Sequence, residues 1–141
     1  MPLNSISPID GRHGKLTAEL ASVFSEAGLM HYRLVVEGEY LIALSHLKLK
    51  LRKITVKEEK IIRALYALTN EDAQIISDIE IKGYKNIKAT DHDTKAIEYF
   101  LKEKLRETSL KDVLEWIHFG LTSQDINNTA IPYSFKMALQ D

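Results

Sequence analysis

The chain has 141 residues, of which 45% are hydrophobic, so it is long enough to bury one core and gives no case for two domains. Its formal net charge of −1 excludes a strongly basic surface for nucleic acid, and the absence of cysteine excludes disulfides and thiolate metal sites. The N-terminus lacks the apolar run of a signal peptide, and no stretch is long and apolar enough to span a bilayer. We therefore expect a single domain over residues 1–141, located in the cytoplasm, with no nucleic-acid or membrane partner.

The opening segment, residues 2–14, has no helical period and is predicted to be a loop. Arg12 and His13 lie between Gly11 and Gly14, where a flexible backbone lets a guanidinium approach a phosphate or a carboxylate. From this pattern alone, an ordinary surface arginine is the favoured interpretation of Arg12.

Two pairs of helices are predicted next. The first pair is a short helix capped by Thr17 and, past a boundary at Gly28, a longer helix that ends at about Leu49. The second pair starts with the capping box formed by Thr55 and Glu58, and Gly83 ends it. The expected apolar face of the longer helix consists of Leu29, Tyr32, Val36, Tyr40, Leu44 and Leu47.

A polar cluster then leads directly into an amphipathic helix. Asp93 is predicted to cap this helix, and Thr90 with Asp93 has the approximate spacing of a capping box. His92 lies between Asp91 and Asp93 at the expected helix start, where unpaired N–H groups favour an anion and the imidazole can donate a hydrogen bond or a proton. A plain helix cap with a solvated histidine is the alternative interpretation. The stripe that would anchor the helix in a core consists of Ala96, Ile97, Phe100, Leu101 and Leu105.

Another capping box, Ser109 with Asp112, predicts a further helix that ends at Gly120. Trp116 is expected in the core. His118 lies near the predicted helix end, where a cation is stabilised, and this role is favoured over catalysis.

The last predicted helix follows the hydroxyl groups of Thr122 and Ser123. This start repeats the arrangement at His92, so the two helix starts could share one anionic ligand, with plain capping as the alternative. Pro132 predicts a kink or a break in the helix. The apolar residues before Asp141 have no glycine stop after them, which predicts a chain cut within a longer protein. No stretch alternates with the period of a strand, so the predicted class is all-α.

Three runs in this chain resemble the adenylosuccinate lyase family of the fumarase/aspartase superfamily. They are SPIDGR at residues 7–12, HDTKAIEYFLKEK at residues 92–104 and TSQDINN at residues 122–128, in the order expected for that family. The long second run is specific to this lyase among its superfamily relatives.

The resemblance implies a β-elimination of fumarate from adenylosuccinate and from succinylaminoimidazole carboxamide ribotide in purine nucleotide synthesis, without a cofactor or a metal. It implies a helical N-terminal domain that lacks the long central helix bundle of the homotetrameric enzyme. The general acid and the general base are then expected beyond residue 141, so this segment would contribute substrate-binding residues and be inactive alone.

The residues that carry over from the resemblance are binding groups. Arg12 and His13 would contact the nucleotide phosphate region, and Thr122 with Ser123 would contact the succinyl carboxylate. Asp91, His92 and Asp93 would lie beside the substrate, with His92 as an auxiliary catalytic group.

Three positions depart from the family pattern: His13 replaces a common tyrosine, Asp91 a common asparagine and Gln124 a common glutamate. Asp91 matters most, because a carboxylate beside an anionic substrate repels it unless the side chain points away or is neutralised.

Two other functions remain open on the sequence. An HD-type metal phosphohydrolase would use the His92–Asp93 dipeptide with His118 and Asp125, although the spacing of these residues is not typical of such a site. A helical protein-interaction module would bind a partner protein and would not respond to AMP or adenylosuccinate.

Overall fold

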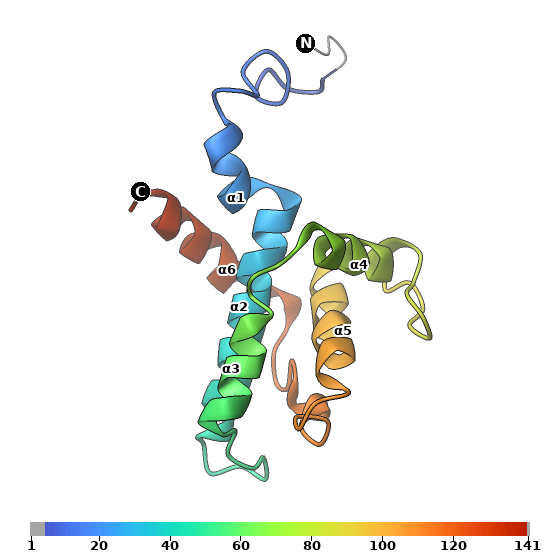
Figure 1. The fold of residues 1–141 in the computed structure, drawn as a ribbon. Coiled ribbons are helices and arrows are strands. Elements are labelled where there is room, and N and C mark those ends of the chain that lie inside the picture. Colours follow the sequence, from blue (N-terminus) through green and yellow to red (C-terminus); the bar gives the residue numbers. More distant parts are fainter. Residues whose placement is uncertain (1–4, 141) are drawn as a thin grey trace.

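The computed structural model describes residues 5–140 and is built from helices joined by short loops (Figure 1). Within these residues no strand forms, apart from one isolated bridge between Tyr84 and Ile87. The predicted all-α class is therefore confirmed. In chain order the elements are η1 (Ala18–Leu20), α1 (Ala21–Phe24), α2 (Glu26–Ser45), α3 (Val56–Ala64), α4 (Asn70–Ile81), α5 (Asp93–Leu105), η2 (Leu114–Trp116) and α6 (Ser123–Ala138).

The long helix α2 is the centre of the arrangement. It packs against α1, α3, α4, α5 and α6, and Figure 1 shows α3 alongside it with α4 and α5 on one side. The hydrophobic core is one cluster whose largest fully buried members are Leu34, Leu41, Ile54, Ile62, Ile76, Ile79, Ile97, Phe100, Leu101, Leu105 and Leu110. The stripe predicted for α5 is entirely buried in this cluster.

The boundaries and the buried face of α2 differ from the prediction. The helix begins after Ser25, whose hydroxyl accepts the Gly28 N–H at 3.1 Å, and it ends at Ser45 rather than near Leu49. Gly28 lies inside the helix rather than at a boundary, and a larger residue would not fit there, because a Cβ would lie 2.8 Å from the carbonyl oxygen of Ser22 in α1. Of the six residues expected on the apolar face only Tyr32 and Leu44 are buried, while Leu47 is 59% exposed.

Local capping signals fix the next two helices. The capping box of Thr55 and Glu58 is confirmed at the start of α3, and Thr69 with Asp72 forms a second box at the start of α4. Gly83 follows α4 with φ of +89°, which glycine adopts at no steric cost.

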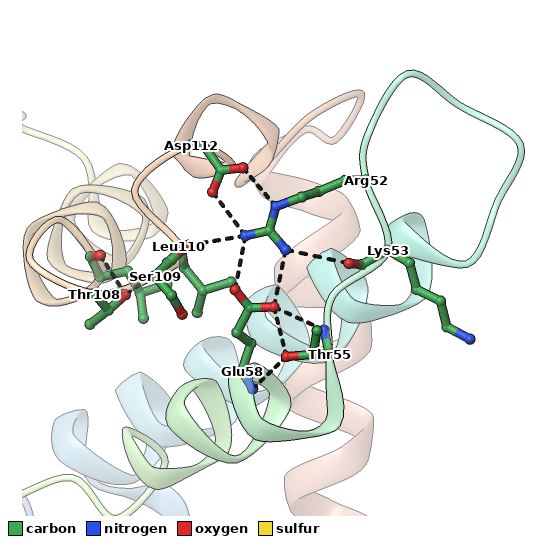
Figure 2. A network of polar contacts seen from close by, with 9 residues as sticks. Arg52, Lys53, Thr55, Glu58, Thr108, Ser109, Leu110 and Asp112 are labelled. Carbon is green, nitrogen blue, oxygen red and sulfur yellow. Dashed lines mark hydrogen bonds and ion pairs between the residues drawn. The ribbon is translucent and has the colours of Figure 1, made fainter.

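The predicted capping box of Ser109 and Asp112 is wrong. The Arg52 guanidinium binds both Asp112 carboxylate oxygens, at 2.6 and 2.8 Å, and donates to the Ser109 carbonyl oxygen at 3.0 Å (Figure 2). The Asp112 carboxylate is therefore engaged with Arg52, and only the short η2 forms in this segment. Trp116 is only partly buried and packs against the edge of the core.

Near the C-terminus, α6 continues through Pro132 from Ser123 to Ala138, so the helix does not break there, and a kink stays a prediction. In the opening segment, residues 5–14 form bends and turns as predicted, while residues 2–4 and Asp141 lie outside the described residues. No helix in residues 5–140 is long and apolar enough to cross a membrane.

Arg52 also holds the N-terminus of α3. It donates to both oxygens of the Glu58 carboxylate, at 3.0 and 2.9 Å, and Thr55 adds hydrogen bonds from its N–H and its hydroxyl (Figure 2). These contacts, first those from Arg52, lower the pKa of Glu58 from 4.5 to about 2. One arginine therefore joins the 46–55 loop, α3 and the 106–113 turn.

Arg52→Ala is expected to lower the free energy of unfolding by about 1–3 kcal/mol at neutral pH, because the nearly buried Glu58 carboxylate loses its charged donor. Since the folded pKa of Glu58 is depressed, its contribution is full above pH 4.5 and disappears as the pH falls towards 2. Urea unfolding between neutral pH and pH 2, with an NMR titration of Glu58, measures both effects. Arg63→Ala is the control, because Arg63 and its partner Glu39 are both exposed and such pairs contribute at most about 1 kcal/mol. An unchanged Glu58 pKa in Arg52→Ala contradicts this account.

Candidate functional site

The start of α5 is an open helix end. His92 is the N-cap residue, but its side chain makes no capping hydrogen bond, and the Thr90 hydroxyl donates to the His92 carbonyl oxygen at 3.0 Å. The predicted capping box of Thr90 and Asp93 is therefore wrong. Asp93 is instead the first residue of the helix, and its Oδ1 accepts the Thr94 N–H at 2.7 Å.

The His92 ring is 47% exposed at this helix start. Its Nδ1 lies 3.2 Å from the Thr94 hydroxyl and 3.3 Å from Asp93 Oδ1. The Nε2 atom has no partner among the described residues. That edge of the imidazole is therefore available to a ligand.

Asp91 has a backbone role that the sequence did not reveal. Its φ of +49° lies in the left-handed region, which aspartate and asparagine tolerate better than most other residues. Its N–H donates to the Glu80 carbonyl oxygen at 3.0 Å, and the Thr90 N–H donates to the Ile79 carbonyl oxygen at 3.0 Å. The segment before His92 is thus tied to the end of α4, while the Asp91 side chain is exposed.

The start of α6 is a closed helix end. Thr122 caps it, and its hydroxyl donates to Asp125 Oδ2 at 2.9 Å while accepting the Asp125 N–H at 3.4 Å. The Thr122 N–H also donates to Asp125 Oδ2, at 2.7 Å, which lowers the pKa of Asp125. The Ser123 hydroxyl, in contrast, has no hydrogen bond within residues 5–140. The two helix starts looked alike in sequence but differ in the structure. At α5 the group without a partner is Nε2 of His92, and at α6 it is the Ser123 hydroxyl, both judged within residues 5–140.

Arg33 of α2 joins these two helices. Its Nη2 donates to Asp93 Oδ2 at the start of α5, and its Nε donates to Asn127 Oδ1 in α6 at 2.9 Å. The Arg33 side chain is only 8% exposed, whereas that of Asp93 is 37% exposed. The His92–Asp93 and Thr122–Asn128 motifs thus approach one another through a buried guanidinium.

One turn further along α2, Glu37 is completely buried and pairs with Nδ1 of His118. Burial raises the pKa of Glu37, and the hydrogen bond from His118 partly offsets that effect. His118 has a φ of +62° and lies in the turn before α6, so it is not the helix-end cation that the sequence predicted. The pair instead ties this turn to α2.

Arg12 and His13 lie apart from the other candidates. They belong to the turn-rich segment before η1, which Figure 1 shows beyond the α1 end of the molecule. The His13 carbonyl accepts from the Thr17 N–H at 3.1 Å and from its hydroxyl at 3.3 Å. The structure therefore brings together the α5 and α6 motifs but not the Arg12 motif.

Sequence reasoning missed Arg33 and Glu37. Both lie inside the longest helix at a spacing of four residues, where the sequence pattern predicted only an apolar face. Charged residues at i and i+4 within the buried side of a helix were the signal that could have revealed them.

The residues suggested for a metal phosphohydrolase do not converge. Asp93 is bound by Arg33, His118 by Glu37 and Asp125 by Thr122. Across residues 5–140, no group of three or more His, Asp or Glu residues is arranged to hold a metal ion.

His118→Ala is expected to lower the free energy of unfolding at pH 7 by about 3–5 kcal/mol, because the buried Glu37 carboxylate loses its partner. The difference in unfolding free energy between His118→Ala and the unaltered chain should become smaller as the pH falls, since a protonated Glu37 has no charge to neutralise. The double variant Glu37→Gln, His118→Ala should recover part of the loss. Chemical denaturation at pH 5 and pH 7 tests this prediction. His46→Ala is the control, because His46 is exposed at the end of α2 and its loss should change the unfolding free energy little. Equal losses in His118→Ala and His46→Ala would refute the buried pair.

No family model matches the sequence. Three curated relatives are similar to nearly the whole chain and are all named adenylosuccinate lyase. The protein of Dictyostelium discoideum is 50% identical over 98% of the chain, that of Buchnera aphidicola from Acyrthosiphon pisum 41% over 96%, and that of Escherichia coli K12 39% over 96%. The chain spans about 29% of the length of each relative. Over nearly its whole length the chain is therefore similar to one part of these adenylosuccinate lyases, and the resemblance carried by its three motifs is confirmed.

Proposed function

We propose that this chain provides part of the substrate-binding site of an adenylosuccinate lyase. The reaction is a β-elimination: a base removes a proton beside a carboxylate, the C–N bond breaks, and an acid protonates the departing nitrogen. Fumarate leaves, and AMP or aminoimidazole carboxamide ribotide remains. We place this activity in the cytoplasm, as the composition predicts, and within a homotetramer that needs no cofactor, as the resemblance implies.

The single observation that supports the proposal most is the Arg33 bridge between Asp93 and Asn127. Two motifs that are typical of this lyase are far apart in the sequence, and a buried contact ties them to one guanidinium. A ligand with several anionic groups can then meet donors from both helix starts.

His92 and Ser123 are the groups proposed to contact the substrate at these starts. His92 presents an exposed ring whose Nε2 is unengaged, which suits a hydrogen bond to the substrate and an auxiliary role in proton transfer. The Ser123 hydroxyl is the donor proposed for the succinyl carboxylate. Thr122 would contribute mainly by capping the helix, since its hydroxyl is already engaged with Asp125.

The remaining candidates have more distant roles in the proposal. Asp91 would contribute the shape of the backbone before His92, and Asp93 would contribute through its contact with Arg33 rather than with the substrate. Arg12 and His13 would bind the phosphate region of the nucleotide. Because the turn-rich segment that carries them extends beyond α1, away from α5 (Figure 1), they would complete a site together with other parts of the enzyme.

The site must also stabilise the aci-carboxylate charge that builds after proton removal. In the proposal, the general base and the general acid come from the part of the enzyme that the resemblance places beyond residue 141. The groups of this chain therefore bind and orient the substrate, and His92 adds a donor near the reacting atoms.

A chimera, in which this chain replaces the matching segment of the Dictyostelium discoideum enzyme, is expected to release fumarate from adenylosuccinate. In it, His92→Ala and Ser123→Ala should each lower kcat/KM by about 10- to 100-fold, because a hydrogen bond to a charged ligand is worth about 1.5–3 kcal/mol. Neither residue belongs to the buried core, so the melting temperatures should change little. Steady-state kinetics and thermal melts measure the two quantities.

His46→Ala in the same chimera is the matched control and should keep full activity, since His46 is exposed at the far end of α2. An assembled chimera without activity contradicts the proposed function. Full activity of both site variants would leave His92 and Ser123 as parts of helix starts only. Indifference of the chimera to AMP and adenylosuccinate would favour the interaction-module alternative.

A further inference from the structure

A polar stripe runs along α2 within its otherwise apolar surroundings. It consists of Arg33, Glu37 and Tyr40, which recur at helical spacing and all bind residues around the α5 and α6 starts. Arg33 reaches Asp93 and Asn127, Glu37 reaches His118, and the Tyr40 hydroxyl donates to the Phe119 carbonyl oxygen at 3.1 Å. The stripe fixes where the two helix starts lie relative to α2.

Arg33 is the member of the stripe that contacts both helices at once. Its Nη2 and its Nε point to acceptors that belong to different helices, Asp93 of α5 and Asn127 of α6. Both oxygens of the Asp93 carboxylate have a partner, since Oδ2 accepts from Arg33 and Oδ1 accepts the Thr94 N–H. A shift of either helix would break one of the two bonds.

The chemistry of the side chain explains why an arginine is needed here. A guanidinium offers several donors in a fixed plane, so one side chain can hold two separate acceptors in a set geometry. A lysine ammonium is a compact charge on a flexible stem and does not impose the same orientation. Burial adds to the constraint, because a cation that is 7% exposed must keep its acceptors in place.

We infer that Arg33 is a positioning residue of the lyase: it sets the separation and orientation of the helix starts that carry His92 and Ser123. In the proposed function, His92 and Ser123 bind different groups of the substrate. The distance between the two donors therefore determines how well both can bind the substrate at once. This inference rests on the proposed function. It assigns no contact between Arg33 and the substrate.

Arg33→Lys in the chimera tests the inference through the split between KM and kcat. A positioning role predicts that KM for adenylosuccinate rises about tenfold, because both donors are misplaced relative to the substrate. A merely structural role would lower the fraction of folded enzyme, and so would lower the apparent kcat while KM stays unchanged. Arg63→Lys is the matched control, since Arg63 also donates to two separate acceptors, the carboxylates of Glu39 and Glu59, but lies on α3 away from the site.

A second measurement needs no substrate. In the 141-residue chain, NMR order parameters at the first turns of α5 and α6 should fall from about 0.85 towards 0.6 in Arg33→Lys and stay unchanged in Arg63→Lys. An unchanged KM in an active Arg33→Lys chimera overturns the inference and leaves the proposed function intact. A chimera that is inactive without any substitution contradicts the proposed function, and rigid helix starts in Arg33→Lys then overturn the positioning role as well.

Discussion

The arrangement of this chain depends on one constraint: a guanidinium that is almost excluded from water must keep its acceptors. Arg33 is 7% exposed on the central helix α2, and its acceptors lie on two other helices. Because an unpaired buried cation is costly, α5 and α6 are held where their side chains can reach it. The hydrophobic core places these helices approximately, and the polar contact sets their final register.

A second arginine, Arg52, also joins segments that are distant in the sequence. Arg52 binds Glu58 at the start of α3 and Asp112 in the turn before η2, so it joins the 46–55 loop, α3 and the 106–113 turn. Its own side chain is 38% exposed, which leaves it closer to solvent than Arg33. The two arginines differ accordingly: Arg33 joins two helix starts inside the molecule, and Arg52 joins one helix start to two loops nearer the solvent.

Local signals in the sequence predicted much of the fold, and distant arginines account for two errors. The box at Thr55 forms as expected, and the helix start expected after the hydroxyls of Thr122 and Ser123 also forms, with Thr122 as its cap. The boxes expected at Asp93 and Asp112 do not form, since Arg33 and Arg52 bind these carboxylates from 60 residues earlier in the chain. The candidate site followed the same rule: the motifs were visible in the sequence, but the buried residues that join them were not.

The left-handed backbone at Asp91 bears on how this position can vary. When a residue is retained for its backbone conformation, selection acts on the φ angle and permits exchange among the few side chains that tolerate it. Asparagine and aspartate belong to that set, and glycine does so without strain. An exchange of asparagine and aspartate at such a site changes the formal charge but preserves the backbone conformation. A substitution matrix based on charge would therefore overestimate the structural effect of this exchange.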